Sequence, residues 1–320
     1  MTDNSDPKES ALVPAENKAL TTRSSALVKR GLEAIAARQP RIVRFPPDRS
    51  LGQYIIFDSD VNLSVETVSN WFGDSNGLKF TAEAKGTVAV QPGQVLCLKV
   101  SDLASKDISR FSTFNSNDVH TLLLDSPWCG DGDLVFLQHL AGLKGLRLSS
   151  NITITNTGLA YIGGLVELYE LELPGTSIGD EGLRHLTSLS NLRKLSLMYT
   201  RVSGEGLKHL RSLSNLESLA LDLTNAFTDE GLKYLQDLSN LQSLFLSETG
   251  ISDAGLKHLQ SLSNLSLLSL RNTKVSDNGL KYLQNLSKLE ILDLRDTHVS
   301  DEGLDHIKHA LPNCKFNGES

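Results

Sequence analysis

The stretch that decides the fold is NLRKLSLMYTRVSGEGLKHLRSLS at residues 191–214, which returns as NLQSLFLSETGISDAGLKHLQSLS at 240–263. Aligned in this register, the chain contains eight copies of 24 or 25 residues: 118–141, 142–166, 167–190, 191–214, 215–239, 240–263, 264–287 and 288–311. A unit this short cannot bury its leucines alone, so the period predicts a stack of units that share one continuous core.

Each copy divides into a strand and a short helix. Leu195 and Leu197 alternate with polar residues, which predicts a short strand with both leucines pointing inward. Leu207, Leu210 and Leu213 follow at intervals of three residues, so they share one face of a helix. Strand, turn, helix and return therefore make up one repeat.

The turn between strand and helix carries its own pattern. We expect the Thr200 hydroxyl to be buried and to bond to the backbone of the neighbouring repeat. Sequences such as Ser252-Asp253 begin a helix, because the hydroxyl caps free N–H groups and the acid complements the helix dipole. A side chain at the glycine of this turn would crowd the adjacent repeat, at Gly182, Gly206, Gly231, Gly255, Gly279 and Gly303.

The full pattern, L-x-x-L-x-L-x-x-T-x-V/I-S/T-D-x-G-L-x-x-L-x-x-L, resembles the leucine-rich repeats of bacterial proteins. It is also similar to the cysteine-containing repeats of F-box proteins, with Thr where those carry Cys or Asn. The resemblance covers residues 118–316. It implies an α/β solenoid, a right-handed superhelix of about eight repeats with strands on the concave side and helices on the convex side.

The two ends of the repeat array differ from its middle, as capping repeats do. The first copy lacks the threonine, and Trp128 and Cys129 occupy its turn. At the end of the last copy, residues 309–316 are expected to form a final half-strand and a cap that closes the sheet edge.

The N-terminal third follows a different pattern. Residues 1–23 are polar and are expected to form a disordered tail, and 24–40 a short basic amphipathic helix that packs on protein or, alternatively, binds anionic membrane. Residues 41–117 alternate like strands and predict a β-rich capping module, with a hairpin at Pro92-Gly93. We expect this module to cover the otherwise open first strand of the solenoid.

Composition excludes several classes of function. The net charge of −7 argues against a nucleic-acid partner, since phosphate binding needs clustered positive charge. No apolar run is long enough for stable membrane insertion, and acids interrupt the start of the chain, which argues against Sec export. Three scattered cysteines favour a reducing compartment. We therefore predict a cytoplasmic protein, with secretion by a non-Sec route left open.

Signals for chemistry are weak. The sequence Gly175-Thr176-Ser177-Ile178-Gly179 matches the nucleophile motif G-x-S-x-G, but its Thr and Ile are ordinary repeat positions. A row of histidines alternates with tyrosines in other copies, which favours a half-buried helix flank over a metal site, at His185, His209, His258 and His306. No catalytic residue, cofactor, metal site or small-molecule substrate is predicted.

The outward strand positions form the candidate site. Apolar residues occupy several of them without helping the core, namely Met198, Tyr199, Phe245, Leu267 and Ile291. Charged residues surround these, with acids in excess: Glu170, Glu172, Lys194, Asp222, Glu248, Arg271, Asp293 and Arg295. An apolar centre with a charged rim is typical of a protein interface.

Three hypotheses of function follow. The first is a non-enzymatic scaffold that binds a protein partner on the concave face. The second is an adaptor or delivered effector, for example one related to ubiquitin ligases, whose residues 1–117 engage a second partner. The third is an enzyme with its chemistry in 41–117, which ranks last because that segment contains acids but no histidine.

Overall fold

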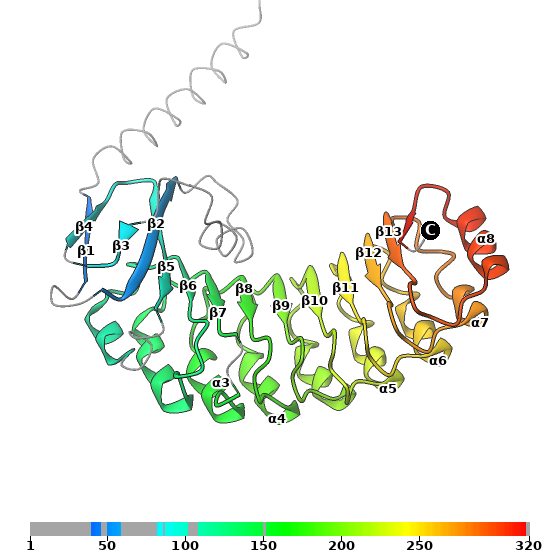
Figure 1. Cartoon of the computed structure of the whole chain (residues 1–320), viewed down its shortest axis with the longest axis horizontal. Coiled ribbons are helices and arrows are strands. Elements are labelled where there is room, and N and C mark those ends of the chain that lie inside the picture. Colours follow the sequence, from blue (N-terminus) through cyan, green and yellow to red (C-terminus); the bar gives the residue numbers. More distant parts are fainter. Residues whose placement is uncertain are drawn as a thin grey trace, which may run out of the picture.

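The computed structural model describes residues 40–45, 50–58, 82–85, 87–101, 108–149 and 152–317. The molecule is an arc whose inner side is lined by strands and whose outer side carries helices (Figure 1). The predicted α/β solenoid is therefore confirmed. The tail expected at 1–23 and the helix expected at 24–40 lie outside the described residues, apart from Pro40.

One strand per repeat builds a single parallel sheet. Leu195, for example, lies opposite Leu171 on one neighbouring strand and Leu219 on the other, so the inward leucines stack in rows. The repeat strands are β6 (Thr121–Leu123), β7 (Gly145–Arg147), β8 (Glu170–Glu172), β9 (Lys194–Ser196), β10 (Ser218–Ala220), β11 (Ser243–Phe245), β12 (Leu267–Ser269) and β13 (Ile291–Asp293). Beyond them β14 (Lys315–Asn317) pairs with β13 in parallel.

The helices of the convex side are short, and many of them are 3-10 in type. Leucines spaced three apart eclipse one another in a 3-10 helix, which has three residues per turn, so the spacing suits this tighter coil. Leu207, Leu210 and Leu213 are fully buried. The helices are η3 (Asp131–His139), α3 (Asn156–Ile162), α4 (Asp180–Leu183), η4 (Arg184–Leu186), η5 (Gly204–Leu210), α5 (Asp229–Leu232), η6 (Lys233–Leu235), α6 (Asp253–Leu256), η7 (Lys257–Leu259), α7 (Asp277–Leu280) and α8 (Asp301–Ala310).

Carboxylates at the helix starts join one repeat to the next. Oδ1 of Asp253 accepts the backbone N–H of Ser276 at 2.7 Å, and Oδ2 accepts its hydroxyl at 2.6 Å. We call this row of side chains the Asp ladder; its members are Asp131, Asn156, Asp180, Asp229, Asp253 and Asp277. The ladder explains the invariant glycine, because a methyl group at Gly206 would lie 2.5 Å from Oδ1 of Asp180. The predicted crowding is thus confirmed.

The ladder is interrupted once, between the fourth and fifth copies. Gly204 replaces the aspartate, and it packs against Gly231 so closely that a methyl group on Gly204 would lie 2.7 Å from the Gly231 backbone. The fifth copy has one additional residue, and the fully buried Phe227 stands where other repeats carry Val or Ile. Backbone packing therefore replaces the hydrogen bonds at this junction.

The threonine hydroxyls do not behave as expected. Thr200 donates to the carbonyl of Leu197 in its own repeat, at 2.7 Å, and Thr249 donates in the same way to Leu246. The expected bond to the neighbouring repeat was wrong, because the turn folds the hydroxyl back over the end of its own strand. In the longer fifth copy, Thr224 does bond to the preceding repeat, through the carbonyl of Leu197 at 3.2 Å.

The described part of the N-terminal module is built from strands. They are β1 (Arg41–Arg44), β2 (Gly52–Asp58), β3 (Ala82–Glu83), β4 (Thr87–Val90) and β5 (Gln94–Val100), followed by η2 (Ile108–Thr113). Strand β5 pairs with β6 in parallel and with β2 in antiparallel fashion, so the module continues the sheet of the solenoid. The module boundary at residue 117 stays a prediction.

The turn at Pro92-Gly93 forms but does not close a hairpin. Gly93 has φ +81° and the N–H of Gln94 bonds to the carbonyl of Gln91 at 3.0 Å, as in a turn with Gly at its third position. The strands on either side belong to different sheets, however, because β4 pairs with β1 and β5 with β2. The expected hairpin was wrong, since the turn only redirects the chain from one sheet to the other.

Candidate binding surface

The predicted site residues lie on the inner side of the arc, on strands β8 to β13 and in the turns that follow them (Figure 1). The backbone groups of these strands are bonded to neighbouring strands on both sides, so the sheet holds the side chains in fixed rows. A rigid surface loses little conformational freedom on binding, which favours affinity. Three patches follow one another along this concave face.

The patch nearest the N-terminal module is ionic. Arg147 bonds to Asp125 at 3.1 Å and lies 3.4 Å from Glu172. Lys194 lies 3.9 Å from Glu170, whose carboxylate is almost fully buried. These charges largely satisfy one another, so this patch offers little free charge to a partner.

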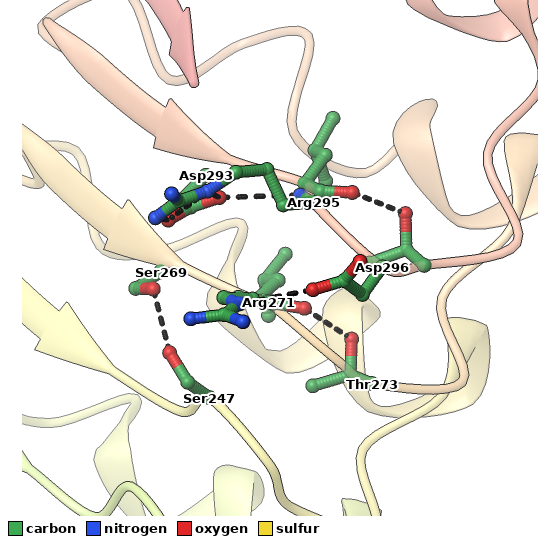
Figure 2. Close-up of polar contacts among 10 residues, drawn as sticks. Ser247, Ser269, Arg271, Thr273, Asp293, Arg295 and Asp296 are labelled. Carbon is green, nitrogen blue, oxygen red and sulfur yellow. Dashed lines mark hydrogen bonds and ion pairs between the residues drawn. The ribbon is translucent and has the colours of Figure 1, made fainter. Parts of the chain in front are cut away.

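A second ionic patch lies at the other end of the face. Figure 2 shows Arg295 bonded to Asp293 through two nitrogens, at 2.9 and 2.5 Å, and Arg271 bonded to Asp296 at 3.0 Å. Burial opposes ionisation of Asp293, but the hydrogen bonds from Arg295 outweigh it and lower the pKa of Asp293. The hydroxyls of Ser247 and Ser269 meet at 2.7 Å beside this patch (Figure 2).

Between the two ionic patches lies a less polar centre. The Tyr199 side chain is 65% exposed, and Met198 and Phe245 are half-buried with their outer ends accessible. Asp222 lies among them and is buried, and its Oδ1 accepts the N–H of Ser247 at 2.8 Å. Burial raises the pKa of Asp222; hydrogen bonds from Ser247 oppose this rise, and the charge of Glu248 adds a smaller rise.

Some predicted site residues are less accessible than their strand positions suggest. Glu170, Asp222 and Asp293 are buried, so the free acidic charge of the face is smaller than the sequence count. Leu267 and Ile291 are half-buried, whereas Lys194, Tyr199, Glu248, Arg271 and Arg295 are exposed. The centre, rather than the whole face, therefore has the character of an interface.

Sequence reasoning missed Leu223, which is 36% exposed at the edge of the centre. It occupies the turn position held by Tyr199 and Glu248 in the flanking repeats, and all three have positive φ, at +59°, +54° and +57°. The signal in the sequence was a leucine at a position that neighbouring copies give to exposed residues. Leu223 follows the inward Leu221 by two residues, as Tyr199 follows Leu197, so the equivalence is visible in the sequence.

Two acids in one turn, Asp131 and Asp133, and the thiol of Cys314 have the residue types of metal ligands or nucleophiles, but the structure gives them other roles. Asp131 accepts from Thr155 and Asp133 accepts from Gly130, so both act as turn acceptors. Burial raises the pKa of Cys314 to about 11, which is the opposite of an activated thiol. Within the described ranges no group of three or more His, Cys, Asp or Glu side chains is placed to hold a metal ion, and no helix there is long and apolar enough to cross a bilayer.

Comparisons with known proteins agree with the repeat pattern. A family model described as a leucine rich repeat matches residues 285–307. The crystal structure of an internalin C2 from Listeria monocytogenes is 26% identical, with a TM-score of 0.47, over 67% of this chain and 92% of that chain. An internalin inlF from the same organism is 19% identical, with a TM-score of 0.38, over 67% of this chain and 77% of that one. A search of curated proteins gives no significant match.

Proposed function

Because the chain is a leucine-rich-repeat protein, we propose that it is a non-enzymatic scaffold that binds another protein on the concave face of its solenoid. The observation that carries this proposal is the centre of that face. Exposed or half-exposed Met198, Tyr199, Leu223 and Phe245 gather there between two patches of paired charges. An apolar centre enclosed by a polar rim is the usual anatomy of a protein interface.

An enzyme is the weaker alternative. Burial raises the pKa of Cys97 to about 12, and burial together with Asp133 raises that of Cys129 to about 12, so neither thiol is ready to act as a nucleophile. The Thr176 hydroxyl of the G-x-S-x-G match donates to Leu173, as the other repeat threonines do within their copies. These contacts support a structural role for Cys97, Cys129 and Thr176.

The adaptor hypothesis also stays a prediction. A ubiquitin-ligase-related module would be helical, whereas the described part of 41–117 consists of β1 to β5 and the short η2. Its strand β5 is already used to pair with the solenoid. We place the protein in the cytoplasm on the sequence argument alone, and a bacterial origin rests on the resemblance of the repeats.

The test combines Met198→Glu with Phe245→Asp, because both side chains point away from the leucine core. We expect this double variant to fold with an unchanged circular dichroism spectrum and to lose the partner that wild type captures from a cell extract. The matched control is Gln260→Glu with Gln284→Asp, which adds the same charge on the exposed convex side. The proposal would be contradicted if the concave variant still captured the partner and the convex control variant did not.

A further inference from the structure

The carboxylates of the concave face fall into two groups, those with an ion-pair partner and those without one. Five of seven have a cation within ion-pair distance on the same face: Asp125 and Glu172 with Arg147, Glu170 with Lys194, Asp293 with Arg295, and Asp296 with Arg271. Asp222 and Glu248 differ, because neither has an ion pair with any residue in the described part of the chain. They lie on neighbouring repeats in the centre of the face.

Asp222 is the more informative of the two. Its side chain is only 8% exposed, yet its charge is met by a backbone N–H of Ser247 rather than by a cation. Removing a carboxylate from water without a counter-charge is unfavourable, and a nearby Glu248 increases the cost. A positive group brought to this place would relieve both effects, so the unpaired acids favour a cationic ligand group.

Apolar side chains stand beside these acids. Tyr199 lies in the repeat before Asp222, and its N–H bonds to the Asp222 carbonyl at 2.9 Å. Tyr199 and Leu223 adopt positive φ, a conformation that is unfavourable for bulky residues. The equivalent turn position holds Gly175 and Asn272 in other repeats, residues for which this conformation is easier. Large apolar groups are thus presented to solvent where smaller residues would fit.

We infer that the partner binds through a basic side chain, arginine or lysine, flanked by an apolar residue, and that this pair docks on Asp222, Glu248, Tyr199, Leu223 and Phe245. We call these five residues the acidic centre. The carboxylates accept the N–H groups of the basic side chain, and the aromatic faces of Tyr199 and Phe245 suit both a guanidinium plane and an apolar neighbour. This inference rests on the proposed function, since it names the chemistry recognised at the same face.

Two other cationic ligands fit less well. A divalent metal ion takes six or more oxygen ligands, and the centre offers two carboxylates beside three apolar side chains. A second candidate is the basic segment of this chain near Lys29 and Arg30, whose sequence also joins basic to apolar residues. We assign the centre to a separate protein and make the chain's own segment an outcome of the test.

The experiment selects ligands from a library of random twelve-residue peptides displayed on phage, with the full chain as bait. We expect the selected peptides to share an arginine or lysine next to an apolar residue. Their affinity, measured by fluorescence anisotropy, should fall about tenfold or more in Asp222→Asn with Glu248→Gln, which keeps shape but removes charge. The matched control, Glu302→Gln with Asp305→Asn on the exposed face of α8, should stay within about twofold of wild type.

The outcomes separate the inference from the proposed function. Two results would overturn the inference alone. In the first, the selected peptides lack basic residues. In the second, they bind the Asp222→Asn, Glu248→Gln variant as tightly as wild type but do not bind the Met198→Glu, Phe245→Asp variant. Peptides that bind the Met198→Glu, Phe245→Asp variant unchanged, or no selection at all, would overturn both. A consensus that reproduces residues 27–30 would also overturn the assignment to a separate partner, since the occupant would then be this chain.

Discussion

Two kinds of junction hold this solenoid together, and they use different forces. At the regular junctions, a carboxylate such as Asp253 bonds twice to the next repeat, and the glycine of that repeat leaves room for it. At the junction between the fourth and fifth copies, Gly204 and Gly231 bring the backbones together and Phe227 completes the packing. Repeats of the same fold are therefore joined either by hydrogen bonds or by close backbone contact, and each kind of junction requires matching residues on the facing repeat.

The strongest test of this contrast restores the consensus residue where it is missing. Gly204→Asp supplies the absent carboxylate, yet its Cβ would meet the Gly231 backbone, which cannot move aside as a side chain could. We expect the free energy of unfolding to fall by about 3 kcal/mol, as for severe overpacking, in a urea titration. If the variant were more stable than wild type, this junction would be a regular junction that lacks its aspartate, rather than a second kind of junction.

A third junction, between the N-terminal module and the first repeat, contains a half-buried histidine, His120. Burial first, then the charges of Lys144 and Arg41, lower the pKa of His120 to about 4. Below pH 6.5 the imidazole of His120 is protonated in the unfolded chain but stays neutral in the folded chain down to about pH 4. The free energy of unfolding therefore falls as the pH drops through that window. We expect a loss of about 3 kcal/mol, from the 1.4 kcal/mol that each pKa unit represents.

His120→Gln provides the comparison for this effect. The variant lacks the titrating group, so its unfolding free energy should depend less on pH between 6.5 and 4 than that of wild type, in urea titrations at both ends of the window. Parallel curves for the two proteins would refute the role of His120, because acids elsewhere contribute equally to both.

Removal of one rung from the Asp ladder should have a smaller effect. Asp253→Ala leaves the N–H and hydroxyl of Ser276 without their acceptor, and we expect a loss of about 2 kcal/mol, since hydrogen bonds to charged groups contribute 1.5–3 kcal/mol. Asp253→Asn should lose about half as much, because Asn156 already accepts the Gly179 N–H in this way. Thermal or urea unfolding that ranks the two variants in the opposite order would remove the ladder as the explanation.

The smallest expected effect concerns a bond within one repeat. Thr249→Val keeps the shape of the side chain but loses the hydroxyl that donates to Leu246 at 2.6 Å. We expect a loss of about 1 kcal/mol, typical of a single neutral hydrogen bond. Thr249→Ser retains the donor and is the control; a larger loss for serine than for valine would indicate that packing of the methyl group, not the bond, matters at this position.

The sequence predicted the periodic parts of the molecule well and the partners of polar groups poorly. Leucine spacing located strands and helices because burial follows simple periods of two and three residues. The direction of the Thr200 hydroxyl and the separation of β4 from β5 depend on backbone paths that periodicity does not encode. The Asp ladder left a signal that went unused, since Asp180 precedes its partner Ser203 by 23 residues, as Asp253 precedes Ser276.

The candidate site shows the same division. Alternation along the strands placed Met198 and Phe245 on the concave face, whereas the burial of Glu170 and Asp293 depends on which neighbours cover them. Leu223 stands two residues after Leu221, as Tyr199 stands after Leu197, but its residue type is that of the core leucines. One-dimensional patterns identify a face, and the three-dimensional packing decides which of its residues a partner can reach.

The glycine contact at residues 204 and 231 also has a mechanical meaning. A hydrogen-bonded rung yields gradually under load, because its donor and acceptor still attract each other over a longer separation. Close van der Waals contact has a much shorter range and loses a quarter to a half of its attraction once a gap of about 0.5–1 Å opens. When the solenoid is stretched from its two ends, we therefore expect this junction, between the repeats that carry Tyr199 and Asp222, to lose its helix-side contact over the shortest extension.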